Sequence, residues 1–352
     1  MRRRVAQGRG LEVTMLIAAA AAAALIPMPP EQVERLYSER FYPAIQGPLT
    51  MVTNLVPVAF FDVAAIVLMA VLVPLFVRRV RSLGTLRAIV RTVTTTVGIA
   101  AVAYLLFLAL WGLNYRRVPL EQKLDYDRAR ITRASVIAFA DRAVARINSG
   151  YGVAHASSAK DLDALQYAFA NAQTALRARR YATPGTPKRS MLGWYFRRAG
   201  IDGMTDPFFL EIIVNPDVLD VEYPMVVAHE WAHLSGYANE SEANFLAWLT
   251  CVRGNPVAQY SGWFAAYQHA MRVLPRQDRS AVQPLAAGPR EDLRAMAARY
   301  ARTSPVVHKA AETVYDEYLR VNRVPEGIGS YDAVLRLMVG TRFDAEWMPV
   351  VR

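Results

Sequence analysis

Two apolar segments near the N-terminus set the strongest limit on how this chain can fold. Residues 57–77 carry one charge, Asp62, and residues 92–115 carry none. Each is long enough to cross the hydrocarbon core of a bilayer as a helix, which takes about 20 residues. An earlier alanine-rich run, which ends at prolines, is either a first membrane anchor or the core of a signal peptide; we favour the anchor. We therefore expect two to three transmembrane helices, at about 13–28, 57–77 and 92–113.

Arginine clusters flank these segments and predict their orientation. Four arginines lie within residues 1–10, and five more lie within residues 78–91, between the second and third apolar runs. Loops rich in Lys and Arg stay in the cytoplasm. We therefore expect a multi-pass protein of a bacterial inner membrane, with its N-terminus in the cytoplasm and everything after Tyr115 on the extracytoplasmic side.

The chain is expected to divide into a membrane anchor, residues 1–115, and one extracytoplasmic domain, residues 116–352. The net charge of +11 raises the question of nucleic acid. The basic residues form no dense stripe along the chain, so we expect no nucleic-acid binding. The single cysteine, Cys251, excludes an intramolecular disulfide, and we expect it to be a buried hydrophobic residue.

Apolar periodicity predicts a mainly α domain with a minor β element. Residues 208–214 give the best strand pattern, residues 183–206 are typical of loop, and residues 31–56 are typical of a polar linker. Helices are expected at 135–148, where Gly150 would end the helix, and at 160–178, 223–235, 239–252, 257–273, 289–301, 305–322 and 331–339.

The expected helix 223–235 carries a pattern with chemical meaning. His229 and His233 lie four residues apart, so they share one helix face and can bind one metal ion between them. Glu230 can then act as a general base toward a metal-bound water. This is the H-E-x-x-H pattern of zinc peptidases, and we expect Zn²⁺ as the cofactor.

A catalytic zinc usually takes a third protein ligand and keeps one position open for water. Gly236 allows a sharp turn after His233, which would bring the acidic start of the next helix near the metal. Glu240 is the preferred third ligand and Glu242 the alternative. Asn244 shares a face with Glu240 and is expected to hydrogen-bond a ligating histidine.

Other residues offer weaker signals. A transition-state oxyanion needs a hydrogen-bond donor, and the candidates are Tyr260, His308 and Tyr331. Strand 208–214 is a candidate for pairing with the backbone of a peptide substrate, although a purely structural strand is as good an interpretation. We expect Trp231 and Trp248 in the core and no special role for His155 and His269.

The H-E-x-x-H motif, with Glu-Ser-Glu-Ala-Asn-Phe at residues 240–245 close behind it, resembles the DUF3810 family of bacterial membrane proteins. Further landmarks at residues 111–115, 260–263 and 329–331 fit that family, so the resemblance covers nearly the whole chain. The family is named for its unknown function, and its members are regarded as candidate zinc metallopeptidases.

The spacing of Glu240, Ala243 and Asn244 is also similar to the Glu-x-x-Ala-Asp pattern of membrane-bound peptidases of the HtpX type. There the first Glu is a metal ligand, which implies the same role for Glu240. This chain departs from that pattern because Asn244 stands where those proteins have Asp.

Together these observations predict a membrane-anchored zinc metalloendopeptidase with a zincin-like domain and peptide or protein substrates. The alternative is a non-catalytic zinc-binding sensor or envelope scaffold, in which Glu242 would supply a fourth protein ligand. The sequence leaves the substrate, protein partners and oligomeric state open.

Overall fold

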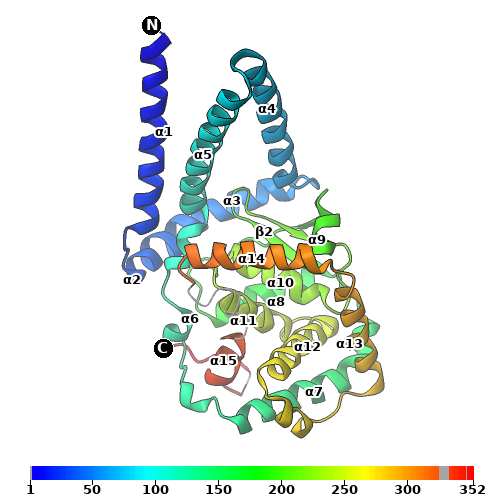
Figure 1. Cartoon of the computed structure of the whole chain (residues 1–352). Helices are drawn as coiled ribbons and strands as arrows, with labels where there is room; N and C mark the ends of the chain where they lie inside the picture. Colours follow the sequence, from blue (N-terminus) through cyan, green and yellow to red (C-terminus); the bar gives the residue numbers. More distant parts are fainter. Residues whose placement is uncertain (1, 325–332, 346) are drawn as a thin grey trace.

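Three long helices lie at one end of the molecule and a helical domain lies at the other (Figure 1). This computed structural model describes residues 2–324, 333–345 and 347–352, and residues 2–11 by their backbone alone. The N-terminus and the turn between the second and third long helices lie at the end away from the domain. The three helices are α1 (Arg2–Leu25), α4 (Phe60–Leu83) and α5 (Thr85–Leu110).

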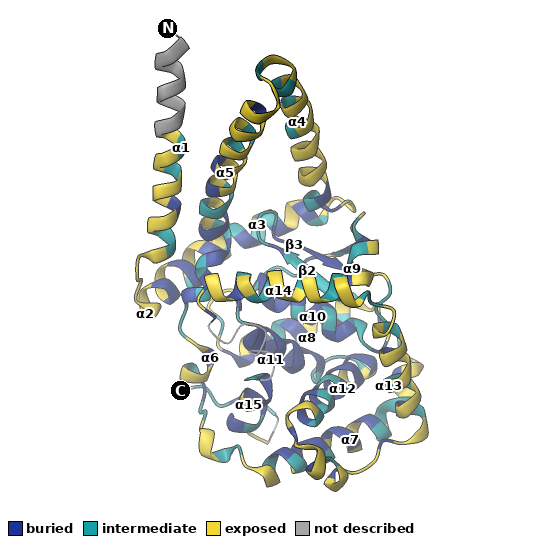
Figure 2. Ribbon diagram, in the orientation of Figure 1, coloured by how far each residue is buried: buried dark blue, intermediate teal, exposed yellow. Residues whose placement is uncertain are grey.

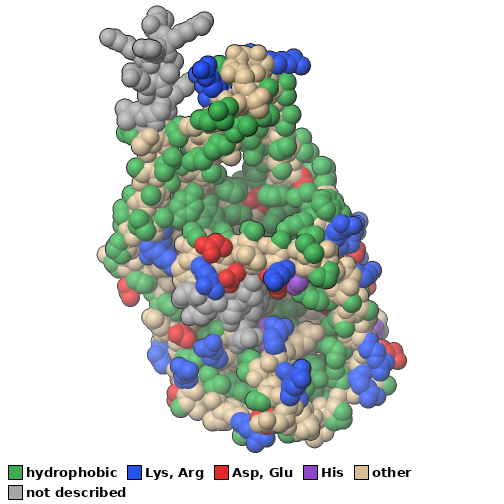
Figure 3. Space-filling model, in the orientation of Figure 1, with side chains coloured by type: hydrophobic (Ala, Val, Ile, Leu, Met, Phe, Trp, Pro, Cys, Tyr) green, Lys and Arg blue, Asp and Glu red, His purple; other side chains and the backbone are tan. Residues whose placement is uncertain are grey.

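Helices α4 and α5 are long and apolar enough to cross a membrane. Only 6% of the most apolar window of α4 and 22% of that of α5 is buried, so hydrophobic side chains cover the outside of both helices (Figures 2 and 3). Apolar surface of this extent is typical of contact with lipid. The apolar helices expected at 57–77 and 92–113 are thus confirmed as candidate spans. Helix α1 begins before the expected residue 13, and it meets the same test only together with residues 30–54.

Residues 30–54 are helical, and the expectation of a polar linker was wrong. They form α2 (Pro30–Gln32), the π-helix η1 (Val33–Phe41) and α3 (Tyr42–Asn54). The polar side chains of α3 are mostly buried against the domain, where Gln46 and Thr50 bond to the backbone oxygens of Thr183 and Leu210. Residues 33–42 and 107–111 contribute to the same hydrophobic core as the domain, so that core extends across residue 115.

The domain is mainly α, as expected. Its longest helix, α7, continues past Gly150, where we expected it to end, because α12 packs along it and the Tyr260 ring lies beside that glycine. The helical elements of the domain are η2 (Gly112–Arg116), α6 (Leu120–Lys123), η3 (Arg128–Arg130), α7 (Arg133–His155), α8 (Leu162–Ala175), α9 (Gly193–Ala199), α10 (Tyr223–Leu234), α11 (Glu240–Cys251), α12 (Pro256–Val273), η4 (Arg276–Ala281), α13 (Ala287–Tyr300), α14 (Pro305–Val321) and α15 (Ala333–Gly340).

A small sheet lies between the domain helices and α3. Its strands are β1 (Pro187–Lys188), β2 (Gly203–Asp206) and β3 (Glu211–Val214), in the order β1-β3-β2. Strand β3 pairs parallel with β1 and antiparallel with β2. The strand expected at 208–214 begins only at Glu211, because a turn precedes it in which Leu210 has a φ of 50°. The expectation of a loop at 183–206 was also wrong, since those residues supply β1, β2 and α9.

Candidate metal centre

Helices α10 and α11 lie side by side at the centre of the core. Every residue of α11 is buried, and Trp231 and Trp248 are 0% exposed, as expected for core tryptophans. Between the helices the chain turns at Gly236, whose φ of 83° is the left-handed conformation that glycine adopts readily. The Asn239 side chain caps α11 by accepting a hydrogen bond from Ser241 N. These local features bring the start of α11 back beside the end of α10.

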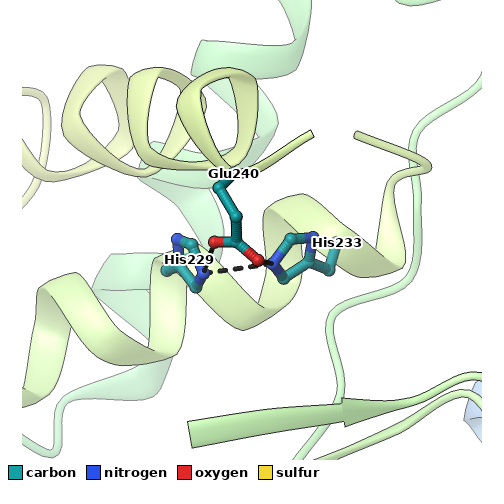
Figure 4. Close-up of side chains that lie close together, drawn as sticks. All are labelled: His229, His233 and Glu240. Carbon is teal, nitrogen blue, oxygen red and sulfur yellow. Dashed lines mark hydrogen bonds and ion pairs between the residues drawn. The ribbon is translucent and has the colours of Figure 1, made fainter. Parts of the chain in front are cut away.

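Three side chains converge at this point (Figure 4). The Nε2 atoms of His229 and His233 are 3.1 Å apart. Glu240 reaches from α11 to both rings, with Oε2 at 3.3 Å from His229 Nε2 and Oε1 at 3.5 Å from His233 Nε2. The side chain of Glu240 is 2% exposed, whereas that of His229 is 17% exposed, so solvent reaches the cluster on the His229 side.

The spacing of these donor atoms fits a tetrahedral zinc ion. Ligands at 2.0–2.1 Å from zinc would be about 3.3 Å apart along the edges of a tetrahedron. The separation of the two histidine Nε2 atoms lies near that value, and each Nε2 also lies 3.3–3.5 Å from one of the two Glu240 oxygens, a different oxygen for each histidine. Within the described part of the chain, the buried Glu240 Oε2 has no hydrogen-bond partner. Its nearest charged partner is His229 Nε2 at 3.3 Å, and a buried carboxylate oxygen in this position is suited to bind a cation.

His233 is oriented so that one lone pair points into the cluster. Its Nδ1 is 2.8 Å from the Tyr237 carbonyl oxygen. A carbonyl can only accept, so Nδ1 carries a hydrogen and the neutral ring presents its Nε2 lone pair to the cluster. The carbonyl of His233 in turn accepts a hydrogen bond from Trp111 Nε1 at 2.9 Å. His233 is therefore held through its ring and through its backbone.

The electrostatics of the cluster favour a cation. Burial alone would raise the pKa of Glu240, but the two histidines outweigh burial and hold that pKa well below its usual value. Burial alone would lower the pKa of His233, but Glu240 outweighs it and the pKa rises to about 9. Positive charge, whether a proton or a metal ion, is thus stabilised between these residues.

Glu230 lies on the β2 side of α10. Its Oε2 accepts a hydrogen bond from Thr205 Oγ1 at 2.8 Å. A Cβ atom at Gly203 would lie 2.5 Å from Glu230 Oε1, so this glycine makes room for the carboxylate. Burial raises the pKa of Glu230, although the two histidines and Thr205 act in the opposite direction. Thr205 and Gly203 have a place in the site that the sequence pattern did not reveal.

Asp206, the last residue of β2, offers a test of buried charge next to the site. It is 1% exposed, and burial raises its pKa from 3.8 to about 6. Because the folded pKa is the higher one, stability is lost as the pH rises from 3.8 through about 6. Asp206→Asn is therefore expected to increase the free energy of unfolding by about 1–2 kcal/mol at pH 8 and by little at pH 4. Thermal unfolding in detergent at both pH values measures this, and an equal shift at both would contradict it.

The structure separates the two candidate third ligands. Glu240 belongs to the cluster, whereas Glu242 Oε1 accepts a hydrogen bond from Leu120 N at 2.6 Å. Asn244 lies beside Glu240, as expected, but its Nδ2 donates to the Glu240 backbone oxygen at 2.9 Å. The partner observed for His233 is the Tyr237 carbonyl and not Asn244, because the turn after α10 brings that carbonyl to the ring.

Two of the three expected oxyanion donors are engaged elsewhere. The Tyr260 hydroxyl donates to Asp292 Oδ2 at 2.6 Å. Both ring nitrogens of His308 have partners, the Ala199 carbonyl at 2.6 Å and the Tyr300 hydroxyl at 2.8 Å. Tyr331 lies outside the described residues. Neither Tyr260 nor His308 is therefore brought to the cluster.

Two other residues lie near the cluster. The Tyr315 hydroxyl, from α14, donates a hydrogen bond to Glu240 Oε1. His269 on α12 is buried, its Nδ1 has no partner among the described residues, and burial lowers its pKa to about 3, with Arg272 and His229 adding to the effect. In sequence, Tyr315 is marked only by its spacing of three residues from Tyr318, which places both half-buried tyrosines on one side of α14.

The family comparison covers all of these residues. The family model described as "Protein of unknown function (DUF3810)" matches residues 37–339 of the 352. The chain belongs to the DUF3810 family. No curated protein and no solved structure matches it. The region shared with DUF3810 begins inside η1 and ends in α15, so it includes α3 and both candidate spans as well as the cluster.

Proposed function

We propose that this DUF3810 protein is a membrane-anchored zinc metallopeptidase with a zincin-like domain. The observation that carries the proposal is the convergence of His229, His233 and Glu240 at the spacing of zinc ligands, with Glu230 one residue along the same helix. Three protein ligands leave one coordination position for water or substrate, as in catalytic zinc sites. The positive-inside rule supports an extracytoplasmic domain on a bacterial inner membrane.

Bound zinc would polarise the peptide carbonyl and lower the pKa of a water molecule at that position. In the proposed mechanism Glu230 takes a proton from this water and returns it to the leaving amine. The hydrogen bond from Thr205 to Oε2 holds the carboxylate while Oε1 faces the Gly203 side. Burial, which raises the pKa of Glu230, brings it nearer to that of a general base acting at neutral pH.

Strand β2 is the best candidate for binding the substrate backbone. The sequence offers residues 208–214 as a candidate for this role, with a purely structural strand as an equal interpretation, but β3 is the central strand of the sheet and is already paired on both sides. Strand β2 lies at the edge, next to α10 and Glu230. A peptide added to an edge strand gains backbone hydrogen bonds without any sequence requirement.

Among the described residues, we prefer Tyr315 to Tyr260 and His308 as the oxyanion donor, because its hydroxyl lies against Glu240. Tyr315→Phe is expected to lower kcat on the order of 10²-fold while stoichiometric zinc is retained. Tyr318→Phe, three residues along the same helix, is the matched control. Steady-state kinetics and zinc analysis measure both variants, and an unchanged kcat for Tyr315→Phe would remove Tyr315 from the mechanism.

The described geometry gives less support to a non-catalytic zinc protein. That alternative needs a fourth protein ligand, and its candidate, Glu242, is engaged by Leu120 N. Metal analysis of the purified protein, combined with an unbiased cleavage profile of envelope proteins, tests the proposal. We expect one zinc per chain and cleavage that a chelator abolishes. Protein without zinc, or zinc protein without any cleavage, would contradict it.

A further inference from the structure

The outer face of α3 and of the residues that follow it is entirely apolar. Within residues 41–58, no exposed residue is polar or charged. Val52 is 57% exposed and Leu55 is 82% exposed. The exposed residues are Phe41, Ala44, Pro48, Met51, Val52, Leu55, Val56, Pro57 and Val58.

The inner face of α3 is polar, which reverses the pattern of a helix on a water-soluble protein. Gln46, Thr50 and Thr53 are at most 2% exposed. Gln46 bonds to the backbone of Thr183 through both its amide nitrogen and its amide oxygen, at 2.8 and 2.9 Å. Thr50 donates to the Leu210 carbonyl at 2.7 Å. The polar face is thus used to attach α3 to the domain, and the apolar face is left outside.

The position of α3 indicates what covers that outer face. The helical segment 30–54 is bent by 104° from α1, so it runs across the direction of the long helices. It lies at the level where those helices meet the domain (Figure 1), and only residues 55–59 separate α3 from the candidate span α4. Figure 3 shows that hydrophobic side chains also cover the long helices above the domain, next to the level at which α3 lies. The apolar face of α3 is therefore continuous with the lipid-facing surface of α4.

We propose that α3 lies in the membrane interface, with this apolar face in the lipid of the leaflet on the domain's side. A helix of this kind lies in the plane of the membrane and does not cross it. Its inner side is joined to the metal centre, because the Tyr42 hydroxyl donates to the Leu234 carbonyl at 2.7 Å, one residue after His233. Lipid contact at α3 thus fixes the distance of α10 from the bilayer and holds the domain against the membrane surface.

Site-directed fluorescence can measure the depth of α3, and it does not depend on peptidase activity. Met51→Cys and Leu55→Cys would each carry an environment-sensitive fluorophore, in the full-length protein in phosphatidylcholine–phosphatidylglycerol vesicles. Val153→Cys, which is 58% exposed on α7, is the matched control far from the membrane. The native Cys251 is buried, so unmodified protein should stay unlabelled, and continued protection of Cys251 shows that each variant is folded.

We expect lipids spin-labelled near the headgroup to quench the fluorophores at residues 51 and 55 several-fold more strongly than the one at residue 153. Aqueous iodide should quench them several-fold less. Equal quenching by both agents at all three positions would overturn the proposal. Protection from iodide without quenching by the labelled lipids would also overturn it, since a protein would then cover the face.

Discussion

Glu230→Gln is expected to lower the rate of peptide hydrolysis by roughly 10²–10⁴-fold, the contribution typical of general acid–base catalysis. Glutamine has the same shape and can still accept the Thr205 hydrogen bond, but it cannot take a proton from water. The carboxylate of Glu230 is not among the three converging donor atoms, so zinc should remain at one per chain. The value of kcat/KM on a peptide from the cleavage profile, and zinc by atomic emission, measure the two effects.

The matched control for this variant is Glu291→Gln, which removes an exposed carboxylate from α13. It should leave both turnover and zinc content unchanged. A Glu230→Gln protein with wild-type turnover would exclude the proposed mechanism. Loss of zinc together with activity would instead make Glu230 a structural partner of the cluster.

Glu240→Gln is expected to reduce zinc affinity by more than the roughly 10–100-fold typical of losing an outer partner of a metal site. The reason is that it removes the one carboxylate that approaches both histidines. Glu242→Gln should keep zinc, because a glutamine oxygen can still accept the hydrogen bond from Leu120 N. Competition with a chelator of known affinity gives both zinc dissociation constants.

The pair of variants separates ligation from folding. Both side chains are buried at the start of α11, so general damage to that helix would affect both variants alike. Thermal unfolding of the zinc-free proteins provides the check on stability. If Glu242→Gln lost zinc while Glu240→Gln retained it, the assignment of the third ligand would be reversed.

Local patterns were enough for most of the long helices and for part of the site. Long apolar stretches predict α4 and α5, and a spacing of four residues places His229 and His233 on one face whatever surrounds them. Gly236 and Asn239 mark the turn and the cap, because their effects act within one or two residues. Such features can be predicted from the sequence because they depend only on neighbouring residues.

Long-range packing decided the rest. Glu240 and Glu242 lie two residues apart in the first turn of α11. Only the packing of α10 against α11 selects which of the two carboxylates faces the histidines. Tyr315 and Glu240 are 75 residues apart in the sequence, and Thr205 and Glu230 are 25 residues apart. The periodic pattern of a single helix or strand cannot predict contacts between residues so far apart in sequence. Residues 41–58 contain both polar side chains, which are typical of a linker, and apolar side chains, which are typical of a membrane helix. The polar side chains face inward because they form hydrogen bonds with backbone groups of the domain at Thr183 and Leu210.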